Sequence, residues 1–554
     1  EGSGLRLPVR RGDFEADSDR VKELSEIKMK IPSENEKSHL NESLRKIAKG
    51  AGVGFTGTFI GMVFGYFSRI IIARFLGASD YGLISLGFAG MSIAVTLSSV
   101  GLPSGIRRFT SFYKGKGDEG RIKGTILSAF KISFPLSLIF ATLVLLGADW
   151  ISTNVFHEPR LTPVLRIFSI GIPFLALSQS FIAGTIGFQT LKYKVYTDDL
   201  FQNLFKLIAM VAFLVLGFGV TGVALGWVLA IVLMPFLALY FLEKKVFPIF
   251  KSRVKAVSID REIFSFSFPL IFVGIAGLVM YWIDTLMLGY FSTASTVGIY
   301  NAALSTARLL SIVSTAFAAI FMPVVTELYA TKMLNDLKKT YSVITKWIVS
   351  LVLPGFLLMA LFSDFIMRIM FGEEFVRGAL ALSILAFGYL VTSLVGPTTS
   401  VLTAYGRTKI IMCCSFVGAT ADFVLNLLLI PLYEINGAAI ATGLSLALMN
   451  VVYLAFVYLI ARMQPYRVNY VKPVLAAVIS VAVVYAATEY LVGLFLFSKV
   501  VSVAGMLLVF VVLYFFLLLI FKCFEEEDLI IMRALDERLG TRSEWVRKII
   551  SRFL

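Results

Sequence analysis

A small set of charged residues interrupts apolar stretches of this sequence that are otherwise long enough to cross a membrane. These residues are Arg69, Lys206, Asp284, Arg308 and Asp422. A charge at the centre of a membrane helix costs about 2.5–3.5 kcal/mol on insertion scales, so such a side chain is expected to face a cavity or a partner. These residues are therefore the first candidates for ligand binding.

The arginines have the chemistry of phosphate binding. A guanidinium group donates two parallel hydrogen bonds to an oxyanion and keeps its charge when buried. We expect Arg69, Arg107 and Arg308 to converge on an anionic group in a cavity. In one alternative, Arg69 forms an ion pair with Asp284. In another, Arg107 and Arg108 only anchor a helix at the membrane surface.

Asp422 and Asn426 offer a different chemistry. They are four residues apart, so on a helix they share one face. Carboxylate and amide oxygens are the ligands of hard cations. The pair therefore indicates either a cation site or a polar contact between two helices.

Membrane helices must position these side chains. The 554-residue chain is 58% hydrophobic and 16% charged, with a mean hydropathy of +0.84, so it is far more apolar than a soluble protein. A helix needs ~20 apolar residues to cross about 30 Å of hydrocarbon. Fourteen runs meet or approach this length, with predicted limits 51–73, 81–104, 125–147, 163–188, 197–218, 219–242, 262–290, 296–323, 338–362, 377–404, 408–432, 436–460, 470–493 and 497–521.

The second half of the chain repeats the first with an offset of about 215 residues. Asp149 matches Asp364, and Glu158 matches Glu373. Because each copy holds six spans, both enter the membrane from the same side, and an axis along the membrane normal relates the two lobes. The predicted fold is an all-α polytopic membrane protein with 14 transmembrane helices, arranged as two six-helix repeats plus two C-terminal helices.

This fold prediction divides the chain into six parts. They are a cytoplasmic, mostly disordered tail (1–50), an N-lobe (51–242), a cytoplasmic linker (243–261), a C-lobe (262–460), two further spans (470–521) and a cytoplasmic amphipathic tail (522–554).

Basic residues gather in alternate loops. The loops predicted to be cytoplasmic are rich in basic residues. One of them contains Lys244 and Lys245, and another contains Lys338 and Lys339, whereas the outer loops contain few basic residues. This is the positive-inside rule, which predicts a multi-pass protein of the cell membrane with both termini in the cytoplasm. The net charge of +15 follows mainly from this topology, so no nucleic-acid partner is predicted.

The sequence contains no motif typical of a catalytic centre or a metal site. Three cysteines and two histidines are scattered along the chain and match no metal-ligand spacing. The outer loops are short, and the pair Glu373 and Glu374 in one of them is more typical of a solvated edge than of a catalytic centre. We therefore predict no firm metal site, no cofactor and no enzymatic activity.

Short motifs carry a resemblance to known transporters. They are Ser68–Gly77, Leu102–Phe109, Ile299–Ala302, Thr306–Leu309 and Met322–Pro323. Over roughly residues 50–520 the chain resembles the polysaccharide or oligosaccharide flippases of the multidrug/oligosaccharidyl-lipid/polysaccharide exporter superfamily, which are related to lipid II flippases.

The resemblance implies two binding sites. A lipid diphosphate would be held by arginines of spans 1, 2 and 8, for which the matching residues are Arg69 or Arg74, Arg107 or Arg108, and Arg308. A sodium site in the C-lobe would use Asp284, Asp422, Asn426 and Thr442. Na⁺ or H⁺ is the expected coupling ion.

The predicted function is that of a flippase that moves a polyprenyl-(di)phosphate-linked oligosaccharide across the cytoplasmic membrane by alternating access, for cell-surface polysaccharide or glycan biosynthesis. The expected partners are the lipid-linked oligosaccharide and membrane lipid, and the protein is expected to be a monomer. One alternative is a cation-coupled exporter of drugs or organic cations with the same fold. Another is a membrane glycan polymerase or glycosyltransferase.

Overall fold

The computed structural model describes residues 34–251, 253–466, 470–491 and 499–523. The chain divides into two units, Glu1–Lys49 and Gly50–Leu554, and the helices described below belong to the second unit except for the first residues of α2. The described part is helical and contains no strand, which confirms the predicted all-α class. The predicted tails, 1–50 and 522–554, lie largely outside the described residues.

The predicted N-lobe is built of α-helices joined by π-helical segments η1 to η3. Its helix α4 begins where the Asp118 side chain accepts a hydrogen bond from the backbone N–H of Arg121, which caps the first turn. In chain order the elements are α2 (Glu34–Ser99), α3 (Leu102–Gly115), α4 (Glu119–Trp150), η1 (Ile151–Val155), α5 (Leu161–Gly187), α6 (Lys192–Lys194), η2 (Val195–Gln202), α7 (Asn203–Val215), α8 (Gly219–Phe241) and η3 (Leu242–Val246).

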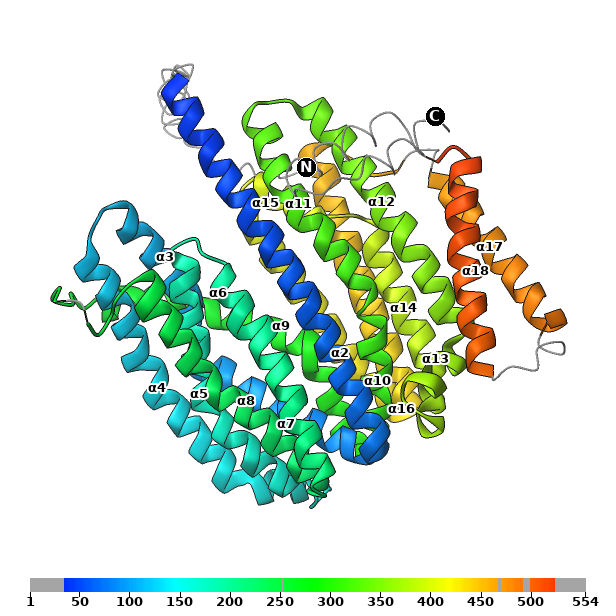
Figure 1. Cartoon of the computed structure of the whole chain (residues 1–554), viewed down its shortest axis with the longest axis horizontal. Helices are drawn as coiled ribbons and strands as arrows, with labels where there is room; N and C mark the ends of the chain where they lie inside the picture. Colours follow the sequence, from blue (N-terminus) through cyan, green and yellow to red (C-terminus); the bar gives the residue numbers. More distant parts are fainter. Residues whose placement is uncertain (1–33, 252, 467–469, 492–498, 524–554) are drawn as a thin grey trace, which may run out of the picture. The chain divides into compact units, whose positions relative to one another are not determined.

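The predicted C-lobe and the two further spans follow in the second half (Figure 1). Their elements are α9 (Asp260–Phe291), α10 (Ala294–Ala307), α11 (Leu310–Ala330), α12 (Leu334–Leu361), α13 (Ser363–Met370), the 3-10 segment η4 (Glu373–Gly378), α14 (Ala379–Leu394), α15 (Thr398–Ala404), α16 (Thr408–Ala461), α17 (Val471–Leu491) and α18 (Lys499–Ile520).

Helix boundaries recur with the offset seen in the sequence. Helix α4 begins at Glu119 and α12 begins at Leu334, 215 residues later. Helices α8 and α5 pack together in the first half, and α16 packs on α14 in the second. The same order of helices is therefore built twice.

Two helices change direction within their length. Helix α2 is interrupted at Gly77, whose φ of 80° lies in the left-handed region that glycine adopts without strain. Helix α16 is interrupted at Glu434, with φ 47°. Each of these helices holds two of the predicted spans.

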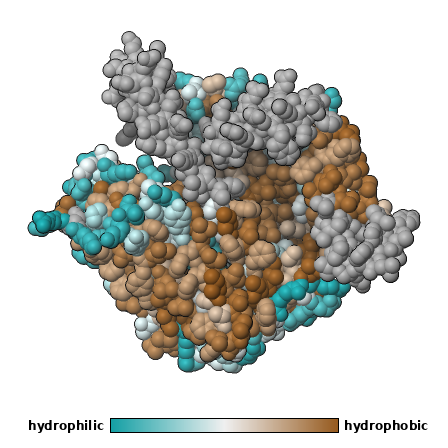
Figure 2. All heavy atoms as spheres, in the orientation of Figure 1, coloured by the Kyte–Doolittle hydropathy of each residue, from teal (hydrophilic) through white to brown (hydrophobic). Residues whose placement is uncertain are grey.

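Nine stretches among the described residues are apolar and long enough to cross a membrane. Two of them, Gly57–Ser99 and Thr408–Ala461, contain the interruptions just described. Figure 2 shows hydrophobic residues over the middle of the visible face and hydrophilic ones nearer its margins. The chain is a multi-pass membrane protein, and the count of 14 spans remains a prediction.

Four predicted spans differ from the structure. The span at 377–404 is divided into α14 and α15, with Gly396 (φ 69°) between them. The span at 81–104 was expected to be one helix, but the chain breaks at Gly101 (φ 68°), and α3 then begins with Pro103 in its first turn. Proline is favoured there because the first N–H groups of a helix have no partner within it. The span at 296–323 is divided into α10 and α11 at Arg308, and the span at 197–218 begins as the π-helical segment η2.

Helices α2 and α10 meet backbone to backbone. A Cβ atom added to Gly82 would lie 1.8 Å from the carbonyl oxygen of Ala294, and one added to Gly298 would lie 1.9 Å from that of Ala78. Such close approach is possible only because both positions lack a side chain. This contact joins the two predicted lobes beside the candidate site.

Candidate functional site

A small cavity of about 30 Å³ contains two of the predicted arginines, Arg69 and Arg308. Its described lining residues include no carboxylate. They come from α2, α8, α9 and α10, with Arg308 at the break that follows α10, and the remaining members are Tyr81, Ile84, Ser85, Phe88, Trp227, Trp282, Asn301, Leu304 and Ser305. Both predicted lobes therefore contribute to one positively charged cavity.

Arg308 is held by aromatic residues. Its guanidinium carbon lies 3.8 Å from the centre of the Tyr281 ring, and its Nη2 donates to the Tyr281 carbonyl oxygen at 3.1 Å. Its Nε donates to the Tyr389 hydroxyl at 3.3 Å. Among the described residues no ion pair joins Arg308 to Asp284. Arg308 and buried Asp284 attract each other electrostatically, but no direct ion pair joins them, and the contacts that orient the guanidinium come from the two tyrosines.

Arg69 faces the same cavity from α2. It is partly buried and interacts electrostatically with the phenol groups of Tyr81 and Tyr281. The alternative in which Arg69 pairs with Asp284 is not seen, because the ion pairs of the described residues do not include it. A second guanidinium without an ion pair among the described residues thus lines the cavity.

The other predicted arginines lie elsewhere. Arg74 donates to the carbonyl oxygens of Ile369 and Met370, at the C-terminal end of α13, where unpaired carbonyl groups attract a cation. Arg107 folds back on its own helix, with Nη2 3.0 Å from Ser104 Oγ.

Arg108 likewise lies away from the cavity. Its guanidinium carbon is 4.1 Å from the centre of the Phe266 ring. The break at Gly101 separates α3, which carries Arg107 and Arg108, from the cavity-lining part of α2. The expected convergence of arginines from spans 1, 2 and 8 is therefore limited here to Arg69 and Arg308.

The four residues of the predicted cation site are all buried, and they fall into two hydrogen-bonded pairs. Asp284 Oδ2 accepts hydrogen bonds from Thr442 Oγ1, at 3.4 Å, and from the Tyr300 hydroxyl. Tyr300 is also 3.1 Å from Thr442 Oγ1, and the backbone N–H of Thr285 donates to Asp284 Oδ1 at 2.7 Å. Tyr300 is not among the predicted site residues, although it lies in one of the motifs that carry the resemblance.

Asp422 and Asn426 form the second pair, on α16. Asn426 Nδ2 donates to Asp422 Oδ1 at 3.2 Å, as the shared helix face predicted. Asn426 Oδ1 is buried and has no hydrogen-bond partner among the described residues. Asp422 and Asp284 are near enough to interact electrostatically, so the two pairs belong to one acidic region. An unpaired oxygen near two carboxylates is chemistry that suits a bound cation.

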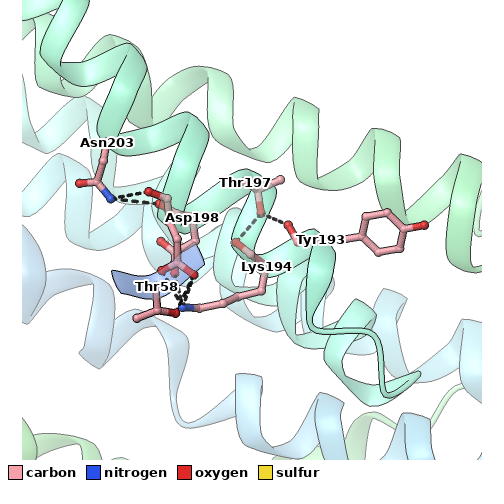
Figure 3. A network of polar contacts seen from close by, with 7 residues as sticks. Thr58, Tyr193, Lys194, Thr197, Asp198 and Asn203 are labelled. Atoms are coloured by element: carbon pink, nitrogen blue, oxygen red, sulfur yellow. Dashed lines mark hydrogen bonds and ion pairs between the residues drawn. The ribbon is translucent and has the colours of Figure 1, made fainter. Parts of the chain in front are cut away.

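A polar network in the N-lobe surrounds the start of the fifth predicted span (Figure 3). Lys194 Nζ lies 2.8 Å from Asp199 Oδ1, and Thr58 Oγ1 donates to Asp199 Oδ2 at 3.0 Å. Buried Lys206 donates to Asn203 Oδ1 at 3.0 Å, and its ammonium lies 4.7 Å from the centre of the Trp227 ring. Lys206 therefore has local partners beside the cavity wall.

Comparison with known proteins places the chain in a family. A family model described as polysaccharide biosynthesis protein matches residues 47–329, just over half of the sequence. The chain belongs to the polysaccharide biosynthesis protein family. A second family model, described as MatE, matches residues 269–428.

Relatives of this polysaccharide biosynthesis family member cover most of its length. It is 23% identical to stage V sporulation protein B of Bacillus subtilis, over 87% of this chain and 96% of the relative. It is 28% identical to the probable low-salt glycan biosynthesis flippase Agl15 of Haloferax volcanii, over 71% of this chain and 81% of that protein.

Solved structures share the fold of this family member. The lipid II flippase MurJ in an inward closed conformation matches with a TM-score of 0.67 at 17% identity, over 86% of this chain and 99% of that structure. An inward-facing multidrug transporter of the MATE family matches with a TM-score of 0.61 at 15% identity, over 74% of this chain and 98% of that structure. The family and the fold are those of transporters, which confirms the prediction that the chain is not an enzyme.

Proposed function

We propose that this transporter is a flippase for a polyprenyl-linked saccharide that carries a phosphate or diphosphate. The observation that carries the proposal is the pairing of Arg69 and Arg308, from different repeats, in one cavity whose described lining has no carboxylate. Two guanidinium groups, of which Arg308 is held by Tyr281 and Tyr389, match the oxygens of a diphosphate. Transport would proceed from the inner to the outer leaflet of the cytoplasmic membrane.

The size of the cavity indicates which step of the cycle the structure represents. A volume of about 30 Å³ holds no more than a few water molecules. A diphosphate with its sugar needs far more space, so the substrate would bind after the lobes separate. Closure around Arg69 and Arg308 would then follow release, when water replaces the anion between the two guanidinium groups.

The names of the relatives favour this substrate class. Agl15 is named a glycan biosynthesis flippase, and MurJ of Bacillus subtilis, a lipid II flippase, is 22% identical over 72% of this chain. Both names describe transport of a saccharide on a lipid. We infer the same class of cargo here from the arginine pair together with these names.

Coupling to an ion is the role we propose for the acidic region. Asp284, Thr442, Asp422 and Asn426 are buried, and none of them lines the arginine cavity. Their oxygens would hold Na⁺, or a carboxylate would hold H⁺, in one conformation of the C-lobe. Binding of an ion that favours one state over the other supplies the population shift that alternating access needs.

An exporter of organic cations is the second candidate, because a MatE family model matches residues 269–428. Such a cargo needs acidic groups at the cavity wall. The two buried aspartates lie outside the described cavity lining, whereas both cavity-lining charges are positive. The electrostatics of the cavity therefore favour an anionic cargo.

The test is transport by the purified full chain in liposomes that contain a fluorescent polyprenyl-diphosphate oligosaccharide. Arg308→Ala is expected to abolish movement between leaflets, and Arg308→Lys to restore little, because lysine lacks the bidentate fork. Arg107→Ala is the matched control, since Arg107 contacts its own helix turn. Normal lipid transport by Arg308→Ala, or uptake of a fluorescent organic cation in place of lipid transport, would rule out the proposal.

A further inference from the structure

The structure contains a second and larger cavity. Its lining residues differ from those of the arginine cavity and come from later parts of the sequence. Its volume is about 340 Å³. The first two turns of α12 form one wall, and the segment that follows α16 forms the other. The lining residues are Asn335, Lys338, Lys339, Ser342, Gln464 and Tyr466.

The α12 wall is set by helix spacing. Asn335 is three residues from Lys338 and four from Lys339, and Ser342 follows Lys339 by three, so these side chains gather on one side of the helix. Helix α12 is 28 residues long, and no side chain caps its N-terminus. Its free N–H groups and dipole add positive potential beside the two lysines. Asp336, in the first turn, offsets part of this potential, but it does not belong to the described lining.

Hydrogen bonds hold the opposite wall in place. Helix α16 ends at Ala461, and the chain turns through Arg462 in the left-handed region. Ser342 Oγ donates to the Gln464 carbonyl oxygen at 3.4 Å, and the Tyr470 hydroxyl donates to the Ser342 carbonyl oxygen at 2.6 Å. The two walls are thus tied together at the cavity floor, where Ser342 is buried.

The cavity offers donors and positive charge without a matching anion. Lys338 and Lys339 form no ion pair among the described residues, and no carboxylate belongs to the described lining. The amides of Asn335 and Gln464 and the hydroxyl of Tyr466 add hydrogen-bond donors. A phosphate group, with several acceptor oxygens and at least one negative charge, complements this set.

The surroundings of the cavity indicate that it lies near the membrane surface. Met333 and Leu334, at the start of α12, are each about half exposed. The lysines lie in the first turns of α12, at the end of a span that the positive-inside rule assigns to the cytoplasmic side. Basic cavities between membrane helices on that side bind the headgroups of anionic lipids.

We propose that the cavity between α12 and the segment after α16 is a phosphate-binding site, distinct from the transport cavity, that takes the headgroup of an anionic phospholipid or a soluble phosphate compound. Lys338 and Lys339 supply the charge, and Asn335, Gln464 and Tyr466 orient the oxygens. The proposal does not depend on the transported substrate, since its test measures binding alone.

The test uses the purified full chain in detergent with dioctanoyl phosphatidic acid, and separately with inorganic phosphate, as probes in a calorimetric titration. Saturable binding is expected, weakened about tenfold or more in a Lys338→Gln/Lys339→Gln variant, because each lysine near a membrane surface contributes on the order of 1 kcal/mol. Binding of the lipid only would assign the headgroup as ligand, and binding of both probes would assign phosphate itself.

Two further variants make the result specific. Lys244→Gln/Lys245→Gln removes the same charge from another exposed lysine pair, in η3, and is expected to leave binding unchanged. Lys338→Arg/Lys339→Arg is expected to retain binding, which separates loss of charge from loss of folding. The proposal is overturned if the wild-type chain shows no saturable binding, or if the two glutamine variants lose affinity equally.

Discussion

Replacing Gly298 by alanine is expected to open the contact between the two predicted lobes. With a cytoplasmic N-terminus, the predicted topology puts the residues between the first two spans, 74–80, on the outer side, so this contact would close the outer side. The new Cβ atom would lie 1.9 Å from the Ala78 carbonyl oxygen, a separation that real Cβ atoms essentially never show. The obstacle is backbone on both sides, so no side-chain rotation relieves it. Helices α2 and α10 must move apart until this distance reaches at least 3.0 Å.

The energetic effect falls on the closed conformation alone. Overpacking a well-packed contact costs typically about 1–3 kcal/mol. When the lobes are apart, Gly298 and Ala78 no longer touch, and the methyl group costs nothing. The ratio of open to closed molecules should therefore rise by about 5- to 150-fold.

Cysteine labelling measures this ratio. Ser85 lines the cavity and is mostly buried in the closed state, so Ser85→Cys, with Cys413, Cys414 and Cys523 replaced by serine, reports access from outside. Gly298→Ala is expected to speed reaction with a membrane-impermeant maleimide by the same factor. Gly82→Ala, on the other side of the same contact, should speed the labelling of Ser85→Cys in the same way.

Gly277→Ala is the matched control, because its Cβ atom would have no neighbour within 4 Å. It adds the same methyl group to a membrane helix without touching the other lobe. Equal labelling rates for Gly298→Ala, Gly277→Ala and the parent would refute the view that the α2–α10 contact closes the outer side.

Three further outcomes are expected. Asp284→Asn should abolish the dependence of transport on Na⁺ or H⁺ gradients, measured in liposomes with imposed gradients; unchanged ion dependence would remove Asp284 from coupling. Tyr300→Phe keeps the ring but loses the hydrogen bonds to Asp284 and Thr442, and should weaken ion dependence by about 10- to 150-fold, since a hydrogen bond to a charged group contributes about 1.5–3 kcal/mol. Phe168→Ala should lower the thermal unfolding temperature, because truncating a buried phenylalanine costs about 3–5 kcal/mol; a wild-type melting curve would contradict the packing of Phe168 against Phe88 and Trp227.

The candidate arginines could be chosen from sequence because burial makes charge costly. Arg69 and Arg308 stand in apolar stretches where only a cavity or partner compensates that cost, and both line the same cavity. The same reasoning selected Asp284 and Asp422. For these residues, local composition was sufficient to indicate an unusual environment.

The positions of Arg74, Arg107 and Arg108 could not be predicted from local composition. They lie near the ends of apolar stretches, where a small change in helix direction decides which way a long side chain points. The break at Gly101 orients α3, and the end of α13 offers Arg74 its carbonyl partners. Both depend on contacts between segments far apart in the chain.

The sequence by itself determined the helical class, the apolar spans and the repeat, because hydrophobic length and spacing are local properties that the membrane selects directly. Tertiary structure alone decided which charges share a cavity and which lysines line the second one. Tyr281 supports Arg308, and Tyr300 supports Asp284, through contacts between helices. Such pairings depend on how the helices pack, including the close approach of the backbones at Gly82 and Gly298. They cannot be predicted from the spacing of residues along one helix.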